Sequence, residues 1–173
     1  MNFILTPIIQ SMTNTKDNHL PTIVYVEDND GDTLLLEEAL RANGHKSELL
    51  VIEKGDTALR YFQVKETAKD VPPPHCILLD NYLPAVKGID LLRFIRGAKA
   101  FDNTPVYIFA DMSMYKDAVN GGLASEKCFI EKPNNWAGFL QLADHLMRSA
   151  EVTMHEGTHG NPEIQPPSAL TGP

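Results

Sequence analysis

The hydrophobic positions of this chain follow two periods that alternate along the sequence. Five short runs are rich in aliphatic and β-branched residues and predict strands, at residues 22–27, 47–52, 75–80, 106–110 and 127–131. Five other segments carry apolar residues at helical spacing, at residues 32–43, 56–64, 88–95, 115–124 and 136–148. Because strands and helices alternate, the pattern predicts an α/β fold with a parallel sheet and right-handed crossovers.

Turn-forming residues separate these elements. Asn43 and Gly44 end the first helical pattern, and Asp56 is predicted to cap the second helix. Three prolines between residues 70 and 75 exclude regular structure and predict a stiff connection before the third strand. Glycines interrupt the fourth helical pattern, which weakens it.

Size and composition fit one compact domain with tails. The chain has 173 residues, 43% of them hydrophobic, and a formal charge of −8 from 15 basic and 23 acidic residues. We expect a domain over residues 21–149, a poorly ordered segment at 1–20 and a disordered tail at 150–173. The acidic balance argues against a duplex nucleic-acid surface, so we expect no DNA binding by this chain.

Several observations predict a cytoplasmic protein. No apolar run approaches the ~18 residues that a membrane span needs. The N-terminus has no cationic region and is interrupted by Pro7, which argues against a signal peptide. The two cysteines, Cys76 and Cys128, lie at the starts of predicted strands and are expected to be reduced core residues.

Charged residues follow three of the predicted strands at their carboxyl ends. Glu27 and Asp28 end the first strand, Asp80 ends the third, and Lys132 follows the fifth. After Asp80 the chain continues through a Leu-Pro turn to Gly88, which opens a helical pattern. Open α/β sheets build their sites at the carboxyl ends of strands. Three acids and one lysine so placed suit a site for a divalent cation and a phosphoryl group.

In these residues the chain resembles the receiver domain of two-component response regulators, over about residues 21–149. The matching features are Glu27-Asp28, Asp80 with its Leu-Pro-x-x-x-Gly turn, and Lys132-Pro133. The resemblance implies a flavodoxin-like, doubly wound sheet of five parallel strands in the order 2-1-3-4-5, with five helices. Asp28 and Asp80 would then face one another across the switch point of the sheet.

The resemblance also implies a role for each site residue. Asp80 would take a phosphoryl group from the phosphohistidine of a sensor histidine kinase, and Lys132 would pair with a phosphoryl oxygen. Mg²⁺ would be bound by Asp28, Asp80 and the backbone carbonyl of Tyr82. Glu27 would act on the cation through a bound water. The protein would signal by a conformational change to a downstream protein or a phosphotransfer protein.

Two positions bear on how such a receiver switches. The family usually has Thr or Ser at the end of strand 4, where this chain has Ala110. The aromatic switch position on strand 5 is Phe129, and an ordinary core residue is the alternative for it. The family commonly has a cis bond before Pro133 and often pairs as a homodimer through its helix 4, strand 5 and helix 5. The long loop before strand 3 is similar to that of single-domain regulators that serve phytochrome-type and hybrid histidine kinases.

The residues also allow four alternative interpretations. Residues 155–159 match the H-E-x-x-H zinc pattern, but they hold a glycine and lie in the predicted tail. Residues 27–32 resemble a calcium loop, but Ala39 stands where a bidentate glutamate is needed. A haloacid-dehalogenase-type phosphatase needs an aspartate in place of Tyr82.

The main alternative is a pseudo-receiver that never carries phosphate, which Ala110 favours. We expect a phosphoaccepting receiver that is not an enzyme and has no output domain of its own.

Overall fold

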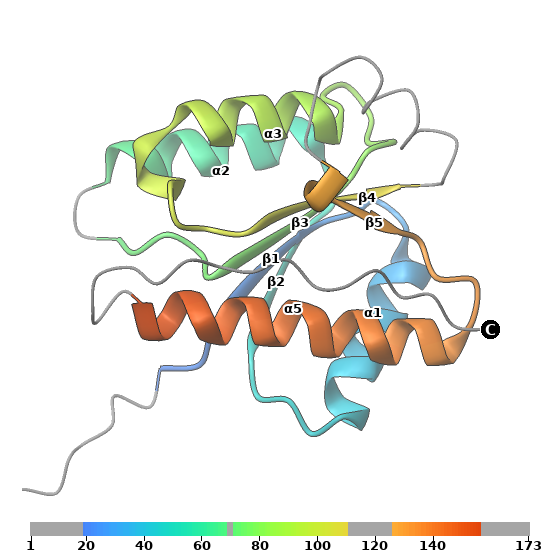
Figure 1. Cartoon of the computed structure of the whole chain (residues 1–173). Helices are drawn as coiled ribbons and strands as arrows, with labels where there is room; N and C mark the ends of the chain where they lie inside the picture. The colour runs from blue at the N-terminus through green and yellow to red at the C-terminus, as the bar shows by residue number, and fades with distance from the viewer. Residues whose placement is uncertain (1–18, 69–70, 111–125, 157–173) are drawn as a thin grey trace, which may run out of the picture.

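The structure, a computed structural model, describes residues 19–68, 71–110 and 126–156. A sheet lies at its centre with helices on both faces (Figure 1). Its five strands are β1 Thr22–Val26, β2 Glu48–Ile52, β3 Cys76–Asp80, β4 Val106–Ala110 and β5 Phe129–Glu131. All pair in parallel in the order β2-β1-β3-β4-β5. The predicted fold class and strand order are confirmed.

Four α-helices lie in the described part of the chain. They are α1 Asp30–Ala42, α2 Gly55–Thr67, α3 Gly88–Gly97 and α5 Trp136–Glu156. Two short 3₁₀-helices, η1 Lys99–Phe101 and η2 Glu126–Cys128, precede β4 and β5. The fourth helix expected at residues 115–124 lies outside the described residues, as do the segments 1–18 and 157–173. The predicted dimer face, which includes that helix, therefore stays a prediction.

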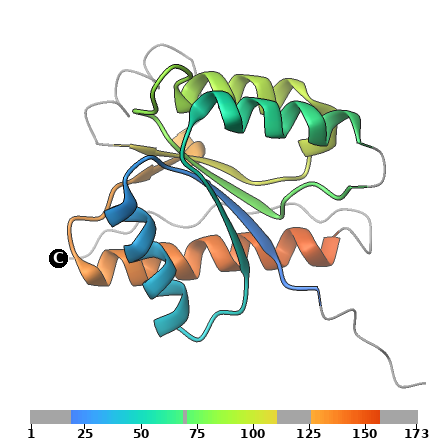
Figure 2. The same ribbon diagram turned by 180° about the vertical axis from the view of Figure 1, so that it is seen from behind.

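Different pairs of helices cover the two faces of the sheet, with α1 and α5 on one and α2 and α3 on the other (Figure 2). Successive residues of a strand point to opposite faces. On β1, Ile23 and Tyr25 join the core under α1 and α5. Val24 and Val26 join the core under α2 and α3. The central strand β3 is buried along its whole length, as expected for a parallel sheet covered on both faces.

Helix α1 begins two residues earlier than the sequence predicted. The side chain of Asn29 accepts hydrogen bonds from the backbone N–H groups of Gly31 and Asp32, at 2.8 and 3.2 Å. Such a side chain satisfies N–H groups that have no partner within the helix, and so it fixes the helix start. The early start places Asp32 in the first turn, beside the carboxyl end of β1.

The prediction that Asp56 caps α2 is wrong. The helix begins at Gly55, with Lys54 at the cap position and no side-chain cap, and Asp56 lies inside the first turn. A side chain at position 55 would clash with the backbone carbonyl of Val86. Close packing against the β3–α3 loop therefore decides where this helix starts, and that contact is not visible in the local sequence.

Helix α5 continues to Glu156, whereas the sequence predicted its end at Arg148. Ala150 is fully buried and extends the apolar face of the helix past the predicted end. Residues 150–156 are therefore helical and do not belong to a disordered tail. His155 lies on this helix, but His159 lies outside the described residues, so the zinc pattern is not tested as a whole.

The two cysteines differ in their surroundings. Cys76 begins β3 and is buried, as predicted, and burial raises the pKa of its thiol. Cys128 lies in η2 and is half-buried, so the prediction that it begins a strand is wrong. Both are free thiols.

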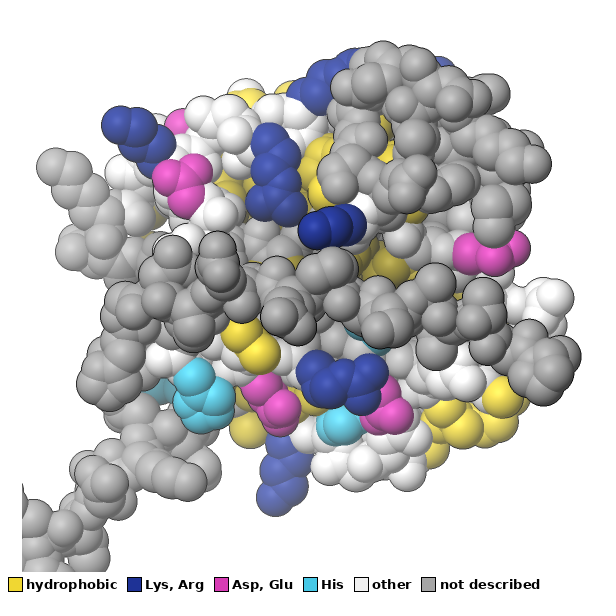
Figure 3. All heavy atoms as spheres, viewed as in Figure 1, with side chains coloured by type: hydrophobic (Ala, Val, Ile, Leu, Met, Phe, Trp, Pro, Cys, Tyr) yellow, Lys and Arg dark blue, Asp and Glu magenta, His cyan; other side chains and the backbone are white. Residues whose placement is uncertain are grey.

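The solvent side of α5 is polar. Figure 3 shows acidic, basic and histidine side chains beside one another over this helix. Charged side chains of both signs are typical of the exposed face of an amphipathic helix. In the described ranges we find no helix whose length and apolar character would let it cross a membrane.

Candidate functional site

Three acidic side chains converge at the carboxyl ends of β1 and β3. Asp80 is the last residue of β3, and Glu27 and Asp28 directly follow β1, which pairs with β3. One carboxylate oxygen from each residue lies within 4.8 Å of the other two. Glu27 and Asp80 are each 1% exposed, whereas Asp28 is an exposed residue. The structure thus brings together the three acids that the sequence grouped.

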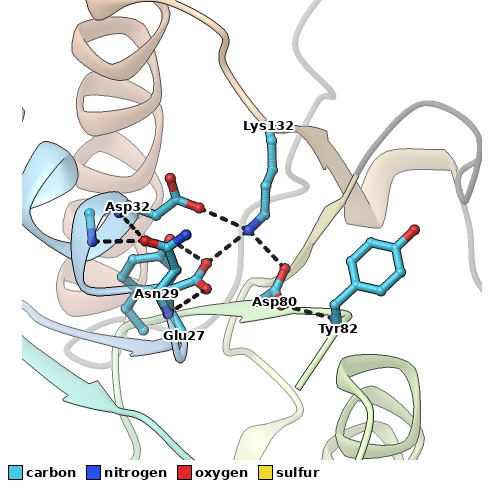
Figure 4. A network of polar contacts seen from close by, with 8 residues as sticks. Glu27, Asn29, Asp32, Asp80, Tyr82 and Lys132 are labelled. Atoms are coloured by element: carbon cyan, nitrogen blue, oxygen red, sulfur yellow. Dashed lines mark hydrogen bonds and ion pairs between the residues drawn. The ribbon is translucent and has the colours of Figure 1, made fainter. Parts of the chain in front are cut away.

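Lys132 places its ammonium group among carboxylates (Figure 4). Its Nζ lies 3.0 Å from Glu27 Oε2, 3.0 Å from Asp32 Oδ2 and 3.0 Å from Asp80 Oδ1. The residue directly follows β5, and its backbone N–H donates to the carbonyl oxygen of Ala110 at 3.3 Å. One cation therefore neutralises charge on β1, β3 and α1 together.

Asp32 is a site residue that the sequence did not predict. It lies in the first turn of α1, and its side chain is 25% exposed. The sequence held one signal for it, because Asp32 stands four residues after Asp28 in an acidic run. That signal could be used only if the start of α1 was known, and the sequence predicted this start two residues too late.

Glu27 is held by several donors. Its Oε2 accepts a hydrogen bond from the Tyr25 hydroxyl at 2.9 Å and one from Lys132. Its Oε1 accepts the backbone N–H of Asn29 at 3.1 Å. Burial raises the pKa of Glu27 above its ordinary value, the charge of Asp80 adds to this, and the bond from Lys132 opposes it without cancelling it.

Aromatic residues form the floor of the site. The rings of Tyr25 and Phe109 meet edge to face, with centroids 6.0 Å apart. The Lys132 ammonium lies 4.9 Å from the centroid of the Phe109 ring, within the range of a cation–π contact. Burial, together with the charge of Glu27, raises the pKa of Tyr25, so its hydroxyl stays protonated and remains a donor.

Lys132 carries a persistent positive charge. Burial alone would lower the pKa of Lys132, but its contacts with the carboxylates of Asp80, Asp32 and Glu27 outweigh burial and raise that pKa above its ordinary value. The peptide bond between Lys132 and Pro133 is trans, and not cis as is common in the family that the sequence resembles.

Backbone contacts orient Asp80. Its Oδ2 accepts the backbone N–H of Tyr82 at 2.9 Å. Neighbouring Asn81 is buried, and its side-chain oxygen accepts the backbone N–H of Ile89 at 3.2 Å, which ties the loop to α3. Gly88 lets α3 begin against the end of β3, because a side chain there would clash with the Asp80 carbonyl. The Tyr82 side chain points to solvent and is 55% exposed.

The donors at this site fit a hard divalent cation. Mg²⁺ and Mn²⁺ prefer carboxylate, carbonyl and water oxygens, and three carboxylate oxygens lie close enough to share one ion. Asp28 is the exposed member of the group, so an ion can reach it from solvent. The part assigned to the Tyr82 carbonyl stays a prediction.

Comparison with known families agrees with this geometry. The sequence model described as "Response regulator receiver domain" matches residues 23–144, a span that holds every residue of the site. The chain belongs to this family. The response regulator Rcp1 of Synechocystis is 26% identical to this receiver over 131 residues, which cover 76% of this chain and 89% of Rcp1.

Solved structures place this receiver close to phytochrome response regulators. The phosphorylated cyanobacterial phytochrome response regulator RcpA has a TM-score of 0.63 and 26% identity, over 78% of this chain and 96% of RcpA. The bacteriophytochrome response regulator AtBRR has a TM-score of 0.59 and 28% identity, over 74% of this chain and 93% of AtBRR. The predicted resemblance is confirmed.

Two positions linked to switching lie at the predicted places in this receiver. Ala110 is the last residue of β4 and is 3% exposed. Phe129 begins β5, is half-buried, and packs against the core that contains Ala110. In the strand register Phe129 pairs with Ile108, two residues before Ala110. Their roles in switching stay predictions.

Proposed function

We propose that this receiver accepts a phosphoryl group on Asp80 from the phosphohistidine of a sensor histidine kinase. It then signals by a conformational change to a protein partner or a phosphorelay. The observation that carries the proposal is the setting of Asp80. One of its oxygens lies 3.0 Å from the Lys132 ammonium, and the other accepts the Tyr82 N–H. A carboxylate held by a cation and a backbone donor suits a nucleophile whose product gains negative charge.

Phosphoryl transfer depends mainly on positioning and on neutralising charge. A carboxylate oxygen of Asp80 attacks the phosphorus of the kinase phosphohistidine, the phosphorus–nitrogen bond breaks, and the histidine leaves and takes up a proton. Lys132 then pairs with a phosphoryl oxygen. Glu27 keeps Lys132 over the site through the ion pair described above. Asp28, Asp80 and the backbone carbonyl of Tyr82 would hold Mg²⁺, which would supply the rest of the charge neutralisation. Glu27 would act on the cation through a bound water. The protein is a signalling receiver and has no separate substrate to turn over.

The names of the relatives suggest the kind of kinase. RcpA and AtBRR are described as response regulators of phytochromes, and both align along nearly their whole length with this receiver. We therefore assign a phytochrome-type or hybrid histidine kinase as the phosphoryl donor. The downstream partner is a protein and not DNA, in keeping with the net charge of −8.

The proposal is tested by labelling with acetyl phosphate and Mg²⁺, followed by intact mass. We expect one added phosphoryl group, which hydroxylamine removes because an acyl phosphate is reactive. Asp80→Asn should abolish labelling. Asp90→Asn is the matched control, because Asp90 is an exposed carboxylate on α3 that pairs only with Arg93 in the described ion pairs. Equal labelling of Asp80→Asn and the parent would show that the site is assigned wrongly.

The alternative is a pseudo-receiver, which binds a partner without carrying phosphate. Ala110 favours it, because no hydroxyl is present at the end of β4 to bind a phosphoryl oxygen. The same experiment separates the two functions. A parent chain that acetyl phosphate and Mg²⁺ never label is a pseudo-receiver.

A further inference from the structure

Three carboxylates surround the Lys132 ammonium, but it donates hydrogen bonds to only two of them, Glu27 and Asp32. An ammonium group has three donors. The Nζ atom lies at the same distance, 3.0 Å, from oxygens of Glu27, Asp32 and Asp80. The contact with Asp80 Oδ1 is an ion pair without hydrogen-bond geometry, so the donors of the ammonium are directed to Glu27 and Asp32 and not to Asp80. A phosphoryl oxygen on Asp80 can therefore gain a well-aligned bond from Lys132 only if the ammonium turns towards β3 and its bond to one present partner weakens.

The three partners differ in how readily they give up the ammonium. Glu27 is 1% exposed, so separating it from Lys132 would leave a charge in the protein interior without its cation. Asp80 carries the phosphoryl group itself, and its charge passes to the phosphoryl oxygens. The side chain of Asp32 is 25% exposed, so water can solvate it as the ammonium leaves. Figure 4 shows Asp32 and Asp80 on opposite sides of the ammonium.

We propose that Asp32 is a positioning residue that competes with the phosphoryl group for Lys132. This inference rests on the proposed function of the site. In the unphosphorylated chain Asp32 draws the ammonium towards α1. When Asp80 carries a phosphoryl group, the ammonium moves towards β3 and Asp32 is released to water. Asp32 therefore sets how readily Lys132 binds the phosphoryl group, and the first turn of α1 senses the charge on Asp80.

The test compares Asp32→Asn with Asp30→Asn in the full chain. Both residues lie in the first turn of α1, so each variant removes one negative charge from the same helix end. Asp30 is exposed and takes no part in the ion pairs of the site. The probe is beryllofluoride with Mg²⁺, titrated by calorimetry. We expect Asp32→Asn to bind it about threefold to fivefold more tightly than the parent, as for loss of a competing, partly exposed ion pair. Asp30→Asn should stay within about twofold.

A second measurement follows the contact without any phosphoryl analogue or metal. The side-chain ammonium of Lys132 is observed by ¹H–¹⁵N NMR in the parent and in both variants. We expect its resonance to shift and exchange faster in Asp32→Asn and to be unchanged in Asp30→Asn. A merely structural role for Asp32 would lower thermal stability and weaken the binding of beryllofluoride, so tighter binding separates the two roles.

The outcomes are distinct. If the parent binds beryllofluoride and Asp32→Asn binds it no more tightly than Asp30→Asn does, competition for Lys132 is excluded. An unchanged Lys132 resonance in Asp32→Asn excludes the contact itself. If the parent neither binds beryllofluoride nor is labelled by acetyl phosphate, the proposed function fails, and the competing role fails with it.

Discussion

At the scale of single residues, burial separates the two acids that follow β1. Glu27 is enclosed, and its oxygens are occupied by Tyr25, Asn29 and Lys132. Asp28 is exposed, although it belongs to the same group of carboxylates. Two residues that are adjacent in sequence therefore have different roles. Glu27 binds side chains and backbone within the protein, whereas Asp28 is exposed to solvent.

Binding of Mg²⁺ should therefore depend more on Asp28 than on Glu27. We expect Asp28→Asn to weaken Mg²⁺ binding roughly tenfold more than Glu27→Gln does, a difference of about 1.4 kcal/mol. The reason is that Asp28→Asn removes the charge of the expected direct ligand, whereas Glu27 would act on the cation only through a water. Calorimetric titration of both variants measures the difference. Equal losses of affinity would contradict the assignment of Asp28 as the direct ligand.

Ala110 should limit how completely the phosphorylated receiver switches. A Thr hydroxyl at this position would add a charge-assisted hydrogen bond to a phosphoryl oxygen, worth about 1.5–3 kcal/mol. We expect Ala110→Thr to enlarge the NMR shift changes around Phe129 on adding beryllofluoride and Mg²⁺. Ala110→Val is the matched control, because it has the shape of Thr without the hydroxyl. A parent that switches fully, or a Val variant that gains as much as Thr, would argue against a missing hydroxyl.

The residues of the site were predictable to different degrees. Glu27, Asp80 and Lys132 lie at the carboxyl ends of strands whose apolar pattern is clear, so parallel pairing alone brings them to one edge of the sheet. Asp32 lies on a helix, where the direction of its side chain depends on where the helix starts. Because Asn29 caps α1, the helix starts two residues before the predicted position. The hydroxyl of Tyr25 was not expected in the site, because a tyrosine inside an apolar strand has the pattern of a core residue.

At the scale of elements, α1 and α5 are joined by polar contacts at the end of α1. The Asn43 side chain donates to the Leu140 carbonyl at 3.0 Å and to Asp144 Oδ1 at 2.7 Å. His45 Nε2 lies 2.7 Å from the same Asp144 oxygen. These contacts fix one end of α1, whose other end carries Asp32 into the site.

Loss of this connection should destabilise the protein. We expect Asn43→Ala to lower the free energy of unfolding by about 1–2 kcal/mol, because two hydrogen bonds are lost and a half-buried carbonyl loses its donor. Urea unfolding measures the change. Asn103→Ala is the control, since Asn103 is exposed and forms none of these contacts. If Asn43→Ala lowers the free energy of unfolding no more than the control does, water replaces the hydrogen bonds of the Asn43 side chain without loss of stability.

The ends of elements were harder to predict than the elements themselves. Buried strands such as β3 carry their own apolar signal, and the ends of every strand lie within two residues of where the sequence placed them. The start of α2 depends on contact between Gly55 and the Val86 backbone, which are far apart in sequence. The end of α5 depends on Ala150, a small residue that is buried only because the sheet lies beneath it. Such boundaries follow from tertiary packing and not from local propensity.

At the scale of the whole molecule, stability is coupled to pH far from the acidic site. His75 precedes β3, and its Nδ1 accepts the backbone N–H of Thr22 at 2.9 Å, which only the unprotonated nitrogen can do. Burial lowers the pKa of His75, and the charge of His19 acts in the same direction. Burial likewise lowers the pKa of His145, on α5.

The receiver should therefore lose stability in mild acid. Because the pKa of His75 is lower in the folded chain, its contribution is complete above the unfolded pKa of about 6.5 and is lost as pH falls through the folded pKa. We expect His75→Asn to make the free energy of unfolding less dependent on pH below about 6.5, because Asn keeps an acceptor and does not titrate there. Urea unfolding between neutral and mildly acidic pH measures this. The free energy of unfolding of the variant should still depend on pH, because His145 also contributes. A pH dependence equal to that of the parent would contradict the role given to His75.

Phe109 and Ala110 are consecutive on β4 but serve opposite halves of the molecule. Phe109 lies in the core beneath α1 and α5 and faces the Lys132 ammonium, whereas Ala110 lies in the core beneath α2 and α3. Under the proposed function, the side of β4 that supports the ammonium and the side that carries the predicted switch position are therefore different. Substitution of the side chain at position 110 should then change the response to phosphorylation while the cation–π contact of Lys132 is kept. A strand with two differently used sides lets evolution vary the response and keep the chemistry.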